Sequence, residues 1–300
     1  MVLPRRDGRV GIRLSAVASL CGLWALAWCA GAAAAEEKET PPSGGTGTSE
    51  QVLAEMKKEL GPGFQYRKVR CFVAASDASA EQFARVCDHT LGECTDAYEK
   101  QFFKAKPTGS YRAYLFKDDA SYRQHAKKLF GDVPDTPFGY YTDSHRALVM
   151  NIGTGGGTLV HEMFHALVRP DFPDIPAWTN EGIASLFEQC QITEQGLMGL
   201  VNWRLPILQS AIRTNDLPAL RKIMTMTDAE FYQSRGGHYA AARYFMLYLQ
   251  EKGVLVEFYR RFRDRFKEDK TGVKFAEEVL TRKLEEFEPD WRKWVMGLKR

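Results

Sequence analysis

Two histidines that could bind a metal ion lie four residues apart in the segment His161-Glu162-Met163-Phe164-His165. In a helix, residues four apart lie on one face, so both imidazoles can reach one Zn²⁺ at about 2.0–2.1 Å. Glu162 then lies beside the two ligands, where its carboxylate can act as general base on a water molecule. The alternative interpretation is a pair of buried, hydrogen-bonded histidines. The motif predicts a hydrolytic zinc site.

A catalytic zinc needs a third protein ligand and an open fourth position. Asp171 lies where the longer H-E-x-x-H-x-x-G-x-x-H pattern places its third ligand, but that pattern needs a glycine at position 168 for the chain to turn back. The residue there is Val168, which is β-branched and disfavours positive φ. The better candidate is Glu181, because it begins a new helix after a proline-rich turn and can return to the first helix.

The two motifs together, HEMFH and PAWTNEGIASLFE, resemble those of the gluzincin clan of metallopeptidases, and the closest similarity is to bacterial peptidase-MA-like domains. The similarity covers about residues 110–298, and its metal motifs are specific. The resemblance implies a zincin-like fold, with His161, His165 and Glu181 as zinc ligands and Glu162 as the base. It also implies a tyrosine or histidine on a later helix that stabilises an oxyanion.

Tyr239, with His238 before it, lies where the resemblance places this oxyanion-stabilising group. A tyrosine at the start of a core helix also has the simpler interpretation of packing. In the expected reaction, Glu162 takes a proton from a zinc-bound water and returns it to the leaving amine of a peptide or protein substrate. The alternatives are a catalytically silent zinc-binding module and a non-peptide hydrolase of a cell-envelope polymer.

The elements that must position these residues predict an α+β fold, in which a small mixed sheet is followed by a mainly helical half. Within one domain at 48–300, we expect an α/β part at 48–157 and a helical part at 158–300. The predicted strands are 66–74, 110–117, 138–142 and 146–152, and the predicted helices begin with 48–60, 79–104 and 118–131.

After a glycine-rich link at 153–157, the sequence predicts helices near 158–168, 179–190, 197–213, 218–225, 228–235, 238–252, 254–267, 273–284 and 288–298. Thr158 is the expected N-cap of the metal-binding helix, and Pro170 should end it. Strand 146–152 leads into that helix. If this strand is the edge of the sheet, an extended peptide could add to it.

Four cysteines follow the N-terminal segment: Cys71, Cys87, Cys94 and Cys190. Seven residues of helix rise about 10.5 Å, whereas a disulfide needs its Cα atoms within about 7 Å. Cys87 and Cys94, on one predicted helix, should therefore not pair with each other. A disulfide would have to join this helix to Cys71 or Cys190, and four buried free thiols are the alternative.

The first 35 residues have the order of a signal peptide: arginines, an apolar stretch from residue 14 to 30, then Ala33-Ala34-Ala35. Residues 36–47 are a polar linker expected to be disordered. The protein is therefore expected to be secreted or periplasmic, with no membrane span in the mature chain. The alternative is that residues 14–35 stay as an uncleaved anchor.

The composition of the 300 residues is that of an ordinary globular protein, with 44% hydrophobic and 26% charged residues. The 41 lysines and arginines nearly balance the 38 acidic residues. This net charge of +3 gives no reason to expect a nucleic-acid partner.

Overall fold

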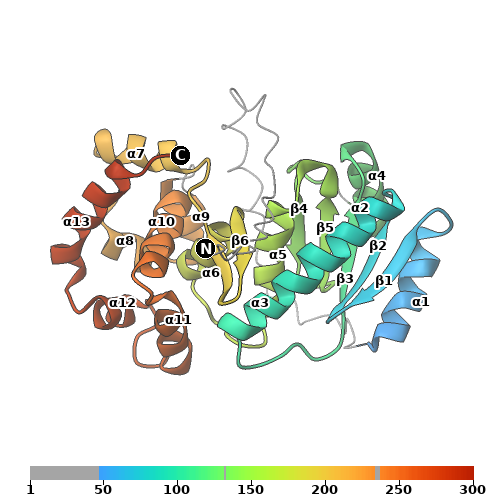
Figure 1. The fold of residues 1–300 in the computed structure, drawn as a ribbon, viewed down its shortest axis with the longest axis horizontal. Coiled ribbons are helices and arrows are strands. Elements are labelled where there is room, and N and C mark those ends of the chain that lie inside the picture. Colours follow the sequence, from blue (N-terminus) through green and yellow to red (C-terminus); the bar gives the residue numbers. More distant parts are fainter. Residues whose placement is uncertain (1–46, 132, 234–236) are drawn as a thin grey trace, which may run out of the picture.

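The computed structural model describes residues 47–131, 133–233 and 237–300. The predicted signal peptide and nearly all of the predicted linker lie outside these residues. The predicted α+β class is confirmed: a five-stranded mixed sheet comes first in the chain, and most helices follow it. In Figure 1 the sheet lies to the right, the helices from α7 onward lie to the left, and α5, α6 and β6 lie between them.

The main sheet has the strand order β1-β2-β3-β5-β4. β1 pairs antiparallel with β2, β4 pairs antiparallel with β5, and β3 lies parallel to both β2 and β5. β5 is therefore an inner strand, and the short strand β4 is the edge. Strand 146–152 is thus not the sheet edge to which a peptide could add. The five strands are β1 (Gln65–Val69), β2 (Phe72–Ser76), β3 (Tyr111–Phe116), β4 (Gly139–Thr142) and β5 (Ala147–Asn151).

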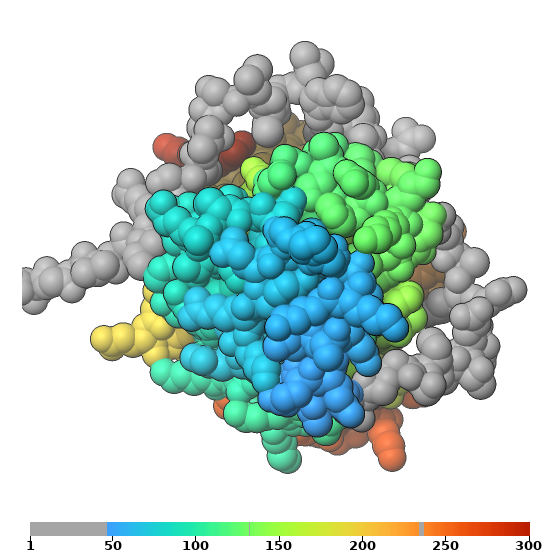
Figure 2. Space-filling model, turned by 90° about the vertical axis from the view of Figure 1, so that its right-hand side faces the viewer, coloured from blue at the N-terminus to red at the C-terminus, as the bar shows by residue number. Residues whose placement is uncertain are grey.

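Helices cover both faces of this sheet. α1 and α4 cover one face, and the run α2–η1–α3 together with α5 covers the other, each over its own apolar core. The space-filling view from the sheet side shows the blue surface of α1 beside the green surface around α4 (Figure 2). The described elements of this half are α1 (Ser49–Leu60), α2 (Ala80–Arg85), the π-helical η1 (Val86–Glu93), α3 (Cys94–Gln101), α4 (Asp119–Phe130) and the 3₁₀ turn η2 (Ile152–Thr154).

The second half is built around α10, which packs closely on α6. Its helices are α5 (Gly157–Val168), α6 (Ala177–Leu186), α7 (Leu205–Arg213), α8 (Leu220–Met224), α9 (Asp228–Tyr232), α10 (Gly237–Glu251), α11 (Leu255–Asp264), α12 (Val273–Leu280) and α13 (Leu284–Gly297). A two-stranded hairpin, β6 (Cys190–Thr193) with β7 (Gly196–Gly199), also lies here. Within the described ranges, no helix is both long and apolar enough to cross a membrane.

Local capping signals confirm several predicted boundaries. Thr48 accepts a hydrogen bond from the Gln51 amide and forms the capping box of α1, which Gly61 ends. Asp118 caps α4 in the same way, and Gly131 ends α4 with a left-handed φ of 91°.

Several predicted elements were wrong in extent; the helix expected at 179–190, for example, ends at Leu186, and β6 begins at Cys190. The strand expected at 66–74 is the hairpin β1–β2, because Arg70 adopts a φ of 54° and reverses the chain. The helix expected at 79–104 contains the π-helical segment η1 and ends at Gln101. The helix expected at 197–213 starts only at Leu205, since residues 196–199 form β7 instead.

The start of α5 also differs from the prediction. Thr158 is not its N-cap: the helix begins at Gly157, and Gly156 takes the cap position without a side-chain hydrogen bond. Gly157 is needed here for space, because a Cβ atom on it would lie 2.3 Å from the carbonyl oxygen of Glu188. This close approach holds the start of α5 against the chain that follows α6.

Candidate metal centre

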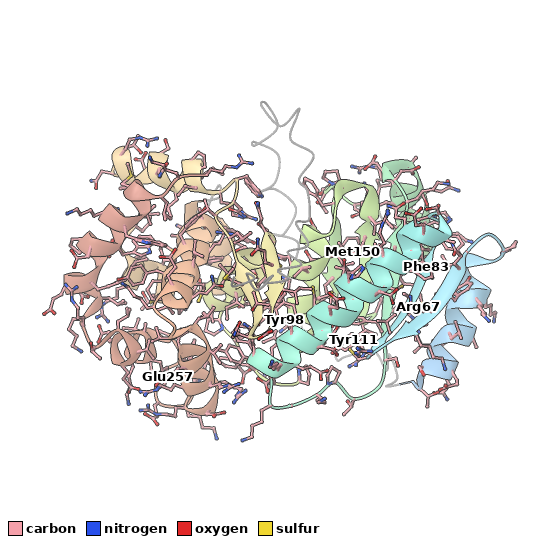
Figure 3. The ribbon with its side chains drawn as sticks, in the orientation of Figure 1. Arg67, Phe83, Tyr98, Tyr111, Met150 and Glu257 are labelled. Atoms are coloured by element: carbon pink, nitrogen blue, oxygen red, sulfur yellow. The ribbon has the colours of Figure 1, made fainter. Side chains whose placement is uncertain are left out.

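α5 carries the two histidines and is almost entirely buried, which fixes its position. Two buried tyrosines, Tyr98 on α3 and Tyr111 on β3, donate hydrogen bonds to carbonyls of α5 (Figure 3). Tyr98 bonds to the Val160 carbonyl at 3.1 Å and Tyr111 to the Ala166 carbonyl at 2.9 Å. The helix is thereby held at both ends by side chains of the first half of the chain.

α6 returns the chain toward α5 and brings Glu181 with it. Asp228 accepts a hydrogen bond from the Ala177 amide at 3.0 Å, which fixes the first turn of α6. Gly182, directly after Glu181, lets α10 pack closely, because a Cβ atom there would lie 3.2 Å from the Ala242 carbonyl oxygen. Glu181 is 6% exposed and lies opposite the two histidines.

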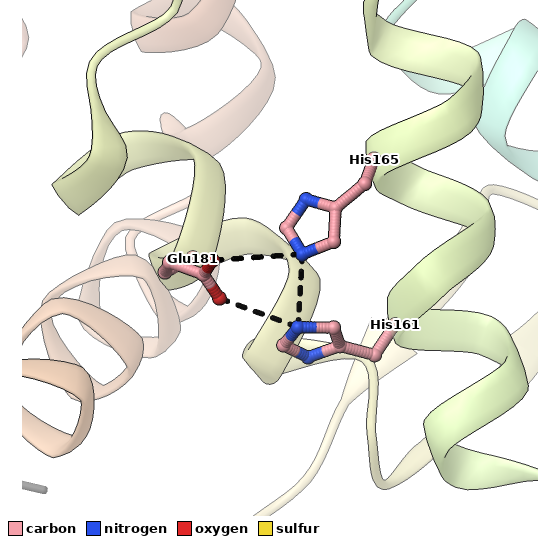
Figure 4. Close-up of side chains that lie close together, drawn as sticks. All are labelled: His161, His165 and Glu181. Carbon is pink, nitrogen blue, oxygen red and sulfur yellow. Dashed lines mark hydrogen bonds and ion pairs between the residues drawn. The ribbon is translucent and has the colours of Figure 1, made fainter. Parts of the chain in front are cut away.

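The three predicted ligands converge (Figure 4). The Nε2 atoms of His161 and His165 lie 3.0 Å apart, and they lie 3.3 and 3.7 Å from the two carboxylate oxygens of Glu181. Four ligands arranged tetrahedrally at about 2.05 Å from one zinc would be separated by about 3.3 Å. The two distances to Glu181 end on different oxygens, and the separations are close to this value, so the three side chains could together hold one metal ion.

The hydrogen bond that His165 makes also supports a metal site. Asn180 Oδ1 lies 2.9 Å from His165 Nδ1, and because this oxygen accepts, the ring carries its proton on Nδ1. In a ring protonated only on Nδ1, the lone pair of Nε2 faces His161 Nε2 and the Glu181 carboxylate. Three acceptors this close together require a proton or a cation between them.

Glu188 lies behind His161, much as Asn180 lies behind His165. Its Oε1 lies 3.2 Å from His161 Nδ1, within ion-pair distance although Nδ1 makes no hydrogen bond. Arg204 binds the same carboxylate with two hydrogen bonds of 3.0 and 2.7 Å, and Asn202 adds one of 3.2 Å. Burial alone would raise the pKa of Glu188, but Arg204 and His161 hold it well below its usual range. The carboxylate is therefore a fixed negative charge behind His161.

The surroundings of His161 favour positive charge. Burial by itself lowers the pKa of this imidazole, but the Glu181 and Glu188 carboxylates raise it to about 10. The same two carboxylates would stabilise a cation bound to Nε2. The charges around the ring thus agree with the distances in supporting a metal site.

Glu162 lies on the open side of α5, next to the ligands. Its Oε2 accepts a hydrogen bond of 3.0 Å from the backbone amide of Tyr141 on the edge strand β4. Burial raises the pKa of Glu162, which makes its carboxylate a stronger base. A half-buried glutamate beside the donor set is the arrangement that a general base requires.

Two tyrosines lie near the cluster. Tyr232, at the end of α9, donates a hydrogen bond of 3.0 Å to Glu181 Oε1. Tyr239 lies on α10 with its ring centroid 6.2 Å from that of Tyr232 and 5.5 Å from the Arg204 guanidinium carbon. The phenol in direct contact with a predicted ligand is therefore Tyr232, and an oxyanion role for Tyr239 stays a prediction.

Asp171, the ligand candidate rejected from the sequence, has a structural role. One of its oxygens accepts hydrogen bonds from the Lys104 and Ala105 amides, at 2.6 and 2.7 Å. The other accepts from Tyr259 at 2.8 Å and from Arg263 at 2.7 Å. This buried carboxylate joins α11 to the loop after α3 and does not belong to the metal cluster.

Sequence reasoning missed Asn180, Glu188 and Tyr232. Asn180 directly precedes Glu181, and Glu188 follows it by seven residues, close to two helical turns. That spacing was a usable signal, because the predicted helix 179–190 would place both acids on one side; in the structure α6 ends at Leu186 and Glu188 lies just after it. Tyr232 had no such signal, since its position depends on how α9 packs against α6. In the comparisons with known proteins, no family model matches this chain, and no curated protein matches it.

Proposed function

We propose that this protein is a zinc-dependent hydrolase, and specifically a peptidase of the gluzincin type. The observation that carries the proposal is the convergence of His161, His165 and Glu181 at separations close to those of ligands on one zinc, with Glu162 beside them on the partly exposed side of the helix. The placement of the HExxH helix against a mixed sheet and of the Glu181 helix against the helical half supports a zincin-like fold.

The chemistry follows from the positions of the chain's own groups. A zinc bound by His161, His165 and Glu181 would supply a Lewis acid and an acidified water. Glu162 accepts a proton and then returns it to the leaving amine. The Tyr141 amide orients the Glu162 carboxylate through Oε2 and leaves Oε1 for this transfer. Tyr239 is retained as the proposed oxyanion donor, with Tyr232 as the nearer alternative.

The edge strand supports a peptide as substrate. β4 pairs on one side with β5, and the Tyr141 amide is on its other, unpaired side, where it points toward Glu162. A peptide that added along this edge as a further strand, beside the Tyr141 amide that Glu162 already binds, would run past Glu162 and the metal donors. Peptide addition at β4 replaces the addition at strand 146–152 considered from the sequence.

We also propose that the protein is exported, because the first 35 residues have the order of a signal peptide. The expected location is the periplasm or the exterior, where a peptidase meets peptide and protein substrates. N-terminal sequencing of the mature protein from cell fractions tests this, and a start near residue 36 is the expected result.

The experiment that tests the activity combines metal analysis with cleavage. We expect about one zinc per chain, and cleavage within a quenched-fluorescence peptide library that is abolished by 1,10-phenanthroline and restored by zinc. Full zinc occupancy without cleavage of any peptide would favour the silent module or a non-peptide substrate. A protein that binds no zinc would overturn the proposal.

A further inference from the structure

One stripe of α5 is partly exposed, while most of the rest of the helix is buried. The four residues of this stripe are Thr158, Glu162, His165 and Arg169, spaced by four, three and four residues. This spacing matches the period of an α-helix, so the four side chains lie along one line. The line contains the proposed base and one proposed ligand, and Arg169 is its most exposed member.

Arg169 keeps the phase of the helix although α5 ends one residue earlier, because its φ of −52° and ψ of −48° are helical. Its Cα therefore lies about 6 Å beyond that of His165 along the helix axis. An extended peptide advances about 3.3 Å per residue, so this offset corresponds to about two residues of a bound peptide.

Arg169 differs from the other arginines around the centre. Arg204 is bound by Glu188 and Arg263 by Asp171, whereas the Arg169 guanidinium makes no ion pair or hydrogen bond to any residue that the structure describes. Burial raises the pKa of both Tyr111 and Tyr232, and the positive charge of Arg169 lowers each of these pKa values in part. The guanidinium is thus an uncommitted cation within electrostatic range of Tyr232, which contacts Glu181.

We propose that Arg169 binds a carboxylate of the substrate, one or two residues from the bond that is cleaved. The inference rests on the proposed peptidase function. The Arg169 guanidinium lies on the same stripe as Glu162 and His165 and offers a planar pair of donors that matches a carboxylate. The carboxylate belongs either to an acidic side chain or to the C-terminus of the peptide.

An exposed arginine at a helix C-terminus also has a purely local benefit, because it interacts well with the helix dipole. Arg213 provides the matched control: it is exposed, it is the last residue of α7, and it also makes no ion pair with a described residue. A purely local role predicts that substituting either arginine leaves the selectivity for peptides unchanged.

The test measures binding to the zinc-loaded Glu162→Gln protein, so that turnover does not interfere. The probes are fluorescein-labelled octapeptide pools in matched pairs. One pair has glutamate or glutamine at fixed positions, and the other has a free or an amidated C-terminus. By fluorescence anisotropy, we expect one acidic pool to bind about tenfold more tightly than its neutral partner, as is typical of one charged hydrogen-bonded contact near solvent.

The preference should disappear in Arg169→Ala, turn into a preference for the neutral pool in Arg169→Glu, and persist in Arg213→Ala. The pair that responds identifies the source of the carboxylate. Equal binding within both pairs, or a preference that survives Arg169→Ala, overturns the inference. Cleavage by the wild-type protein is scored separately. Cleavage without an acidic preference refutes the role of Arg169 alone, and an Arg169-dependent preference without cleavage refutes the peptidase alone.

Discussion

The backbone amide of Tyr141 and the carboxylate of Glu162 are joined by a hydrogen bond of 3.0 Å, which links the edge strand of the sheet to the metal-binding helix. Because the amide belongs to the unpaired side of β4, the bond places the proposed base next to the place where a peptide would lie. In the proposed mechanism, the remaining carboxylate oxygen of Glu162 transfers the proton. This geometry yields a sharp test of the mechanism.

Glu162→Gln should keep the size of the side chain and the acceptor for the Tyr141 amide while removing the base. We expect zinc content and thermal stability to match those of wild type, and kcat to fall roughly 10²- to 10⁴-fold with little change in KM. His161→Ala should instead lose metal and activity together. Zinc analysis and peptide kinetics on both variants check this, and a Glu162→Gln protein that cleaves at the wild-type rate would refute the mechanism.

Substitutions of Glu181 and Asp171, the two candidates for the third ligand, should have different effects on zinc binding and stability. Glu181→Ala should lose zinc affinity with a modest effect on the stability of the metal-free protein. Asp171→Ala removes the buried carboxylate that accepts hydrogen bonds from Arg263, from Tyr259 and from two backbone amides, so we expect a loss of about 3–5 kcal/mol of stability.

Denaturant unfolding of the metal-free proteins and zinc titration at a temperature where both are folded distinguish these outcomes. The assignment of Glu181 fails if Glu181→Ala keeps full zinc affinity and folded Asp171→Ala loses it.

Features set by local chemistry could be predicted from the sequence. The caps at Thr48 and Asp118 depend only on hydrogen bonds within one helical turn, and both occur as expected. The convergence of His161 with His165 depends on helical spacing alone. The prediction of Glu181 as a ligand also required a turn of the right length between the two helices, and the proline-rich segment indicated such a turn.

Features set by packing could not be predicted. Arg70 reverses the chain in a left-handed conformation that its residue type disfavours, so no turn signal marked the β1–β2 hairpin. β7 replaces part of a predicted helix, and Gly199 at its end packs so closely that a Cβ atom there would lie 2.4 Å from the Leu186 side chain, a contact visible only in three dimensions. The position of β5 inside the sheet likewise follows from the crossover that places it beside β3.

The four described thiols should make the protein sensitive to alkaline pH. Burial raises the pKa of Cys71 and Cys190 to about 12 and that of Cys87 to about 11. An unfolded thiol ionises near pH 8.5, so the unfolded state loses these protons first as the pH rises. Below about pH 8.5 these thiols are protonated in both states and do not change the free energy of unfolding with pH. Between about pH 8.5 and pH 11–12, each thiol lowers the free energy of unfolding by about 1.4 kcal/mol per pH unit.

Denaturant unfolding as a function of pH measures this slope, and Cys71→Ala should reduce it by the share of one thiol. A variant with the same slope as wild type would contradict the assignment. In the described residues all four thiols are free. We accordingly expect slow alkylation by iodoacetamide in the native state at pH 8, rapid alkylation after denaturation, and no Cys87–Cys94 peptide in a non-reducing map.

The last prediction concerns Glu188, which holds a negative charge between His161 Nδ1 and the Arg204 guanidinium. A carboxylate behind a ligating histidine orients the ring and makes its other nitrogen a better donor, and losing it typically costs 10- to 100-fold in metal affinity. Glu188→Gln keeps the shape of the side chain and removes the charge. We therefore expect the zinc Kd, measured by competition with a chelator, to rise about 10- to 100-fold, with faster zinc dissociation.

The matched control for this variant is Glu288→Gln, which removes the carboxylate from another partly buried pair with Arg292 on α13. It should lower the stability of the fold somewhat and leave the zinc Kd unchanged. Circular dichroism confirms that both variants are folded under the conditions of the titration. If Glu188→Gln and Glu288→Gln bind zinc with the same Kd as wild type, the Glu188 carboxylate only neutralises Arg204, and His161 is held in place by packing alone.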